Sequence, residues 1–265
     1  MTFHDWAAYF RANQNHLDNL SWDDTYQLTN REKRAIRRSV QHFQKGESSD
    51  GSRFREQARQ LGDPGYEEAL GFFIREEQDH AEVLGRYLDR EELPRLKTHW
   101  IDQIFQVLRR AFSLEHTVRV LLTAEIIAAV YYQALFQATY SGLLQQICRR
   151  ILRDEEMHLH FQCFTLHQLR QDRSRFLDWL IRRAYGGLLA ATTVLVWLSY
   201  FRTLRAGGYG FFAFGNAVWD RWNWTETMQK QAERITIRGQ HVPELADKPR
   251  MEYEFNNAVQ PRWVR

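Results

Sequence analysis

Six side chains of this sequence have types and spacings that suit metal binding. The segments Ile74–His80 (IREEQDH) and Leu152–His158 (LRDEEMH) each contain Glu-x-x-His, so the second segment repeats the first. The offset from Glu77 to Glu155 also relates Glu47 to Glu125, and each of these two lies at the same distance before its motif. Carboxylate and imidazole groups are ligands for iron, manganese and related divalent metals. The candidate ligands are therefore Glu47, Glu77, His80, Glu125, Glu155 and His158.

Helices must bring these residues together. Apolar residues recur at spacings of three and four over most of the chain as far as Arg183, which indicates helix. Turn sequences at 61–65 and 139–142 predict two antiparallel helical hairpins. At about 1.5 Å per residue, each hairpin brings its single Glu level with its Glu-x-x-His motif. Within a motif, residues i and i+3 share one helix face.

Four carboxylates buried together need compensating charge. Desolvation and mutual repulsion cost several kcal/mol for each group, and two divalent cations would balance the four charges. The alternative is a set of surface salt bridges, but such pairs need neither the repeat nor the matched spacing. The repeat therefore favours a buried site for two metal ions.

The doubled Glu…Glu-x-x-His pattern resembles that of the ferritin-like di-iron carboxylate superfamily. The resemblance covers about residues 35–168 and is specific for the metal site, not for the reaction. It implies an all-α fold: a ferritin-like four-helix bundle with a long crossover at 89–110 that includes a short helix near 100–108. We expect a single domain over 1–265, with a C-terminal helical and aromatic extension at 169–265.

The resemblance also implies individual roles. One metal would take Glu47, Glu77 and His80, and the other Glu125, Glu155 and His158, with Glu77 and Glu155 as bridges. The residue before each motif Glu would orient the histidine of the other motif. We therefore expect Asp154 to contact His80 and Glu76 to contact His158. The cofactor would be two iron ions, with manganese or a mixed Mn/Fe pair as alternatives.

Residues one or two turns from the candidate ligands predict the wall of a cavity. They are mostly apolar, which suits an apolar or aromatic substrate, although plain helix-bundle core would have the same pattern. Gly46–Gly51 is a poor helix sequence that could leave room beside Glu47, form a π-bulge or allow close helix packing. The predicted cavity residues are Phe43, Gly51, Phe54, Phe73, Leu121, Ala129, Tyr132 and Ile151.

Residues 184–201 carry no charge and follow two arginines. This length just reaches that of a membrane-spanning helix, but two Gly, two Thr and a Ser dilute the apolar character. We expect a buried helix or the wall of an apolar pocket, with membrane contact as the alternative. Further on, residues 207–215 predict a flexible aromatic loop, and a short helix should end near residue 234.

Composition limits the other possibilities. The chain has 265 residues, a net charge of +3 and two cysteines, Cys148 and Cys163, which form no CxxC motif. A rubredoxin-like metal module is thus excluded, and we expect a reducing cytoplasmic location, with one peripheral to a membrane as the alternative. Basic residues are spread along the chain, so nucleic acid is not expected as a partner. A tRNA hydroxylase would have to use the Arg-rich segment 31–38.

The predicted function is oxidation of a small apolar or aromatic molecule by O2 at the di-iron site, with electrons from an external donor. The extension beyond the predicted bundle could roof a pocket or form a homodimer face. Iron storage, or a peroxidase of ferritin or rubrerythrin type, is the first alternative. A membrane-associated di-iron enzyme that acts on a quinone is the second.

Overall fold

The computed structural model describes residues 2–97, 113–170 and 173–238, with side chains as far as Gln229. The described residues form helices and no strands, which confirms the all-α prediction. The predicted helix near 100–108 and the last part of the predicted extension, residues 239–265, lie outside these residues. In chain order the helices are α1 (Phe3–Asn13), η1 (His16–Asn19), α2 (Asn30–Glu47), α3 (Ser52–Leu61), α4 (Pro64–Arg90), α6 (Leu114–Gln137), α7 (Gly142–Leu169), α8 (Arg175–Ala206) and α9 (Phe211–Arg238).

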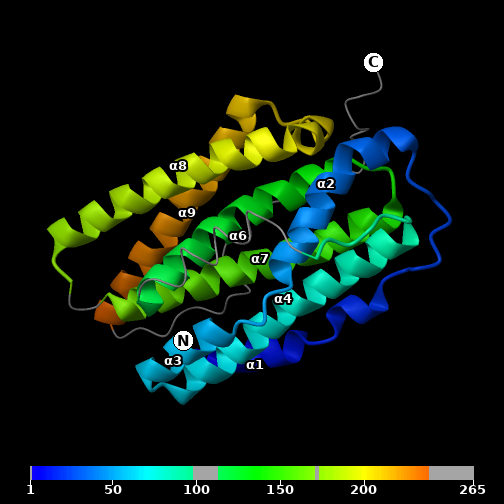
Figure 1. The fold of residues 1–265 in the computed structure, drawn as a ribbon. Coiled ribbons are helices and arrows are strands. Elements are labelled where there is room, and N and C mark those ends of the chain that lie inside the picture. Colours follow the sequence, from blue (N-terminus) through cyan, green and yellow to red (C-terminus); the bar gives the residue numbers. More distant parts are fainter. Residues whose placement is uncertain (1, 98–112, 171–172, 239–265) are drawn as a thin grey trace.

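Both predicted hairpin turns are confirmed. The first turn ends at Asp63, whose side chain accepts a hydrogen bond from the backbone N–H of Tyr66, and Pro64 begins α4. The second ends at Ser141, which caps α7 in the same way. Helix α4 ends at Arg90, at the start of the predicted crossover. The long helices α2, α4, α6 and α7 lie alongside one another (Figure 1), and they pack as α2 on α4, α6 on α7, and α4 on α7.

The first hairpin contains a helix break directly after Glu47. Helix α2 ends there, and the chain becomes helical again at Ser52, after Gly51 has adopted a left-handed conformation with φ of 63°. A β-carbon at Gly51 would lie 2.5 Å from Cδ1 of Ile74. The position therefore needs glycine both for its backbone angles and for the close approach of α4. The helix break after Glu47 is therefore a turn, and the π-bulge that was one of the possibilities for Gly46–Gly51 does not form.

The N-terminal helix α1 packs along α4. Its buried face consists of Phe3, Trp6, Ala7 and Phe10. Phe10 lies 5.3 Å from Phe161 of α7 and 6.1 Å from His158, measured between ring centroids. Helix α1 thus closes one side of the region in which the two histidine motifs meet.

Helices α8 and α9 lie against α6 and α7 and contact each other (Figure 1). The backbone carbonyl of Ala134 leaves no room for a β-carbon at Gly207, so the end of α8 approaches α6 closely. The prediction of a loop over 207–215 is wrong beyond Gly210, because α9 already begins at Phe211. The helix predicted to end near 234 is likewise longer, reaching Arg238.

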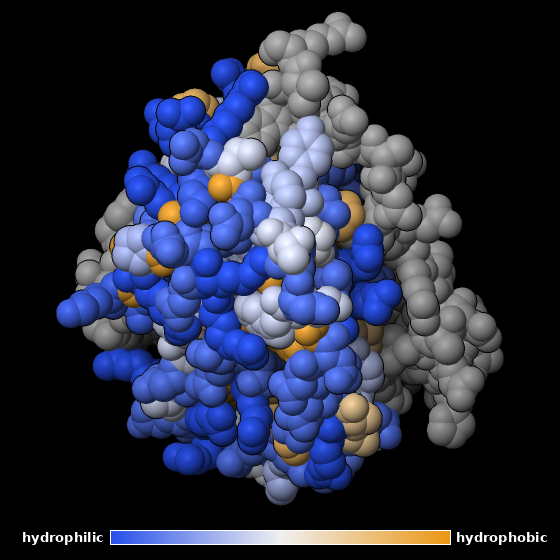
Figure 2. Space-filling model, turned by 90° about the vertical axis from the view of Figure 1, so that its right-hand side faces the viewer, coloured by the Kyte–Doolittle hydropathy of each residue, from blue (hydrophilic) through white to orange (hydrophobic). Residues whose placement is uncertain are grey.

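Two of the described helices are long and apolar enough to cross a membrane, and they differ in burial. In α6 the most apolar window is 83% buried, as in the core of a globular protein, whereas in α8 it is 33% buried. The prediction of a buried helix at 184–201 is therefore wrong, while the prediction of a pocket wall holds for its inner face. Figure 2 shows one face of the molecule, on which hydrophilic residues predominate and hydrophobic ones are scattered.

Candidate metal centre

The six predicted ligands come together from four helices. Their ligand atoms form two groups in which all atoms lie within 4.8 Å of one another. One group contains Glu47, Glu77 and His80, and the other contains Glu77, Glu125, Glu155 and His158. Glu77 belongs to both groups, as a bridging ligand must. The assignment of Glu155 as a second bridge stays a prediction.

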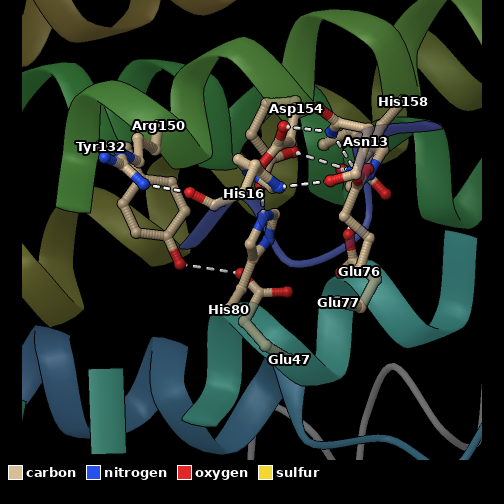
Figure 3. Close-up of polar contacts among 12 residues, drawn as sticks. Asn13, His16, Glu47, Glu76, Glu77, His80, Tyr132, Arg150, Asp154 and His158 are labelled. Atoms are coloured by element: carbon tan, nitrogen blue, oxygen red, sulfur yellow. Dashed lines mark hydrogen bonds and ion pairs between the residues drawn. The ribbon is translucent and has the colours of Figure 1, made fainter. Parts of the chain in front are cut away.

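Each histidine is held by the carboxylate expected from the sequence. Nε2 of His80 lies 2.9 Å from Oδ2 of Asp154, and Nε2 of His158 lies 2.8 Å from Oε2 of Glu76 (Figure 3). Both imidazoles are fully buried. These contacts fix the ring orientation and leave Nδ1 of each histidine facing the carboxylates.

Five polar atoms inside the cluster lack hydrogen-bond partners. Among the described side chains, Oε1 of Glu77, both carboxylate oxygens of Glu155, and Nδ1 of His80 and His158 are buried without a hydrogen bond. Nδ1 of His158 is 2.9 Å from Oε1 of Glu77, but the two atoms are not aligned for a hydrogen bond. Unpartnered buried polar atoms are rare in native proteins. Their convergence, with oxygen and imidazole donors only, fits a pair of iron or manganese ions.

Burial and mutual repulsion shift the pKa values of the clustered side chains. Burial raises the pKa of Glu47 well above its ordinary value of 4.5, and the charge of Glu77 adds to this. Burial and the charge of Glu125 raise the pKa of Glu155 in the same way. Burial acts against ionisation of His158, but the charge of Glu77 and the contacts with Glu125, Glu155 and Glu76 together outweigh burial and raise the pKa of His158 well above 6.5. The cluster therefore retains protons that divalent cations would displace.

Tyr132 contacts a candidate ligand directly. It lies two helical turns after Glu125 on α6, and its hydroxyl donates a 2.8 Å hydrogen bond to Oε1 of Glu47. Burial raises the pKa of Tyr132 well above 10, and the charge of Glu47 adds to this, so the phenol stays protonated. Tyr132 thus occupies one oxygen of Glu47 and leaves the other for a metal.

The sequence did not predict two contributors from the N-terminal region. The amide of Asn13 donates hydrogen bonds to Glu76 (2.6 Å) and Asp154 (3.0 Å). Nε2 of His16 lies 2.7 Å from Oδ2 of Asp154, the same oxygen that Nε2 of His80 contacts (Figure 3). Burial raises the pKa of Asp154, but hydrogen bonds from His16 and His80 outweigh it and hold that pKa well below 3.8. His16 and Asn13 lie outside the repeat, so nothing in the repeat pointed to them.

A cavity of about 560 Å³ reaches the carboxylates. It is bounded by residues of α2, α3, α4, α6 and α8, and Glu47, Glu77 and Glu125 form part of its wall. Its exposed lining residues lie around the break between α2 and α3, whereas its lining residues from α6 and α8 are buried or half-buried. The hydroxyl of Thr117 is buried in the cavity wall with no hydrogen-bond partner among the described residues. Cavities of this size accommodate small organic molecules.

Five of the eight predicted cavity residues line this space, namely Phe43, Gly51, Phe54, Phe73 and Leu121. The prediction is wrong for Ala129, Tyr132 and Ile151, which are fully buried in the core. On α6 the cavity is lined by Leu121, Ala124 and Ala128, and α8 packs on α6, whereas the side chains of Ala129, Tyr132 and Ile151 are fully buried away from the cavity. The α8 residues Thr192, Val196 and Tyr200 line the cavity instead.

Comparison with known proteins gave no match: no family model, no curated protein and no solved structure resembles this chain significantly.

Proposed function

We propose that this chain is a ferritin-like di-iron oxidoreductase that uses O2 to oxidise a small apolar organic molecule. In this proposal α2, α4, α6 and α7 form the four-helix bundle, and α8 and α9 belong to the extension that covers it. The observation that carries the proposal is the convergence of five unpartnered ligand atoms from Glu77, His80, Glu155 and His158 inside a cluster of four carboxylates and two imidazoles.

The residues would share the ions in two sets. Glu47 and His80 would hold one ion, and Glu125, Glu155 and His158 the other, with Glu77 between them. Asp154 and Glu76 hold the imidazoles in orientation, and Tyr132 holds Glu47. When bound, the two ions would supply the redox chemistry toward O2, and an external donor would supply electrons. Manganese in one or both positions is compatible with the same donors.

The cavity supports an organic substrate over iron storage. A storage site needs a path for hydrated ions, whereas this cavity has an apolar inner wall that includes Phe54, Leu121 and Val196. The aromatic and aliphatic side chains would bind an apolar molecule and exclude water from the carboxylates. The unpartnered hydroxyl of Thr117 could bind one polar group of that molecule. A membrane-associated version of the enzyme is favoured by one further observation, the exposed apolar face of α8.

Metal content provides the direct test. The chain is purified without metal, reconstituted with Fe(II) in the absence of O2 and analysed for iron. We expect two ions per chain, a loss of metal in Glu47→Ala and His158→Ala, and full retention in Glu56→Ala, an exposed residue of α3. Zero or one ion in the unsubstituted protein contradicts the proposal. Oxygen consumption by the reduced protein, absent in both ligand variants, then separates an oxidase from a static metal site.

A further inference from the structure

Exposed hydrophobic residues are concentrated on two helices. Of the twelve large hydrophobic residues that are exposed in the described part of the chain, all but Leu61 and Tyr140 belong to α8 or α9. The most exposed are Phe212 (79%), Phe176 (74%) and Leu198 (67%). Scattered exposed hydrophobic residues are ordinary, but a contiguous group marks an interaction surface.

On α8 five of the seven exposed large hydrophobic residues form one stripe. Phe176, Leu180, Val194, Leu198 and Phe201 follow one another at intervals close to whole helical turns, so they share one face. Between Leu180 and Val194 the exposed positions on this face are Arg183 and then small residues (Ala184, Gly187, Ala190 and Ala191), and residues 184–201 carry no charge. This stripe is the outer face of α8.

Arginines flank the outer face at both ends. Helix α8 contains Arg175, Arg182 and Arg183 near its start and Arg202 and Arg205 near its end. Its one acid, Asp178, already pairs with Arg170. Arg182 pairs with Glu226, but the other four arginines have no carboxylate partner among the described residues. The guanidinium groups of Arg183 and Arg202 lie instead over the rings of Trp179 and Phe201.

The opposite face of α8 is buried, so only the outer face can contact a partner. Leu189, Val196 and Leu204 are buried against the rest of the protein, and α8 packs on α6, α9 and α2. The helix therefore cannot be surrounded by lipid as a membrane-spanning helix is. It can lie parallel to a bilayer surface, with apolar side chains inserted and arginines at the level of the headgroups.

We infer that the outer face of α8 binds a bilayer surface that contains anionic phospholipids. The four arginines without a described carboxylate partner complement anionic headgroups, and each would contribute to attraction near such a surface. A second copy of the chain fits less well. Both ends of the stripe carry arginine, so a symmetric dimer would bring arginine against arginine in either orientation. The inference rests on this surface alone and not on the proposed metal chemistry.

Vesicle flotation of the full chain tests the inference. We expect the protein to float with vesicles of phosphatidylcholine and phosphatidylglycerol, to bind phosphatidylcholine alone weakly, and to lose binding as salt is raised. Leu198→Glu and the double variant Arg183→Glu/Arg202→Glu should each weaken binding roughly ten-fold or more. Leu61→Glu, an exposed leucine of α3, is the matched control and should bind normally.

Several outcomes would overturn the inference. One is absence of binding to the anionic vesicles by a folded protein, as judged by circular dichroism. Another is a dimer in buffer that Leu198→Glu converts to a monomer, since the face would then join two copies. A third is binding that appears only when residues 239–265 are removed, because that segment would then cover the face. Glu155→Ala should bind vesicles normally, which separates this inference from the metal site.

Discussion

One carboxylate oxygen, Oδ2 of Asp154, lies between two imidazoles, 2.7 Å from Nε2 of His16 and 2.9 Å from Nε2 of His80. His80 is fully buried, whereas the side chain of His16 is 26% exposed. The three residues come from η1, α7 and α4, so this chain of contacts joins the N-terminal region to the candidate metal centre. Arg150 of α7 binds the backbone carbonyls of His16 and Asn19 and holds that region in place.

Substitution of Asp154 should weaken the metal centre selectively. Asp154→Asn keeps the size of the side chain but removes the charge that orients His80. Loss of such an outer contact typically costs about 10–100-fold in metal affinity. We expect this loss for one of two ions, measured by calorimetric titration with Mn(II). Glu156→Gln, two positions further along α7, is the control. Equal affinities in both variants would show that Asp154 does not orient a ligand.

Removal of one cluster carboxylate should stabilise the metal-free protein. The pKa of Glu155 is raised in the folded state, so its ionisation opposes folding at any pH above its ordinary value of 4.5. At pH 7, Glu155→Gln should therefore raise the free energy of unfolding of the metal-free chain by about 1–3 kcal/mol. The same variant should lose the stabilisation that added Fe(II) or Mn(II) gives the unsubstituted protein. Thermal unfolding with and without metal measures both effects, and a metal-free variant less stable than its parent would contradict the prediction.

A buried carboxylate far from the cluster should make stability depend on pH in the opposite direction. Glu32 is fully buried and accepts hydrogen bonds from the N–H groups of Thr29 and Tyr140 and from the hydroxyl of Tyr26. Burial raises its pKa, but these bonds outweigh burial and lower it below 4.5. Its contribution is therefore present above pH 4.5 and is lost as pH falls through the lower folded-state value.

The corresponding variant is Glu32→Gln. It should lower the free energy of unfolding by about 1–3 kcal/mol at pH 7, because it leaves buried donors without a charged acceptor. The difference from the parent should shrink as pH falls below the ordinary glutamate value of 4.5. Urea unfolding at several pH values measures it, with Glu56→Gln on the exposed side of α3 as the control. A difference that does not change with pH would refute this role of the Glu32 charge.

The two glycines beside Glu47 should respond to alanine in opposite ways. Gly51 has φ of 63° and no room for a β-carbon, so Gly51→Ala should cost about 1–2 kcal/mol or more. Gly46 lies in α2 with nothing within 4 Å of a β-carbon, so Gly46→Ala should stabilise the protein by up to about 1 kcal/mol. Chemical unfolding of the two variants in parallel measures the difference. Similar values would mean that the break after Glu47 is not fixed by Gly51.

Local repetition made the centre of this site predictable. Periodicity placed the four long helices, and the repeat that relates Glu77 to Glu155 selected six residues that do converge. The contributions of Asn13 and His16 could not be predicted, because they depend on where α1 packs and not on the repeat. The cavity was predicted in part for a similar reason. Helical position identifies the face of α6 near Glu125, but the packing of α8 decides which edge of that face remains open.

The residues that line the cavity and those that could hold metal come partly from different helices. Helices α3 and α8 contribute Phe54, Thr192 and Val196 to the wall and none of the six candidate ligands. Helix α8 also departs from helical geometry at Tyr200, another lining residue. The shape of the cavity can therefore change through these two helices while the carboxylates and imidazoles stay in place. If the site works as proposed, such a division would let substrate preference diverge among descendants of one sequence while the six candidate ligands stay unchanged.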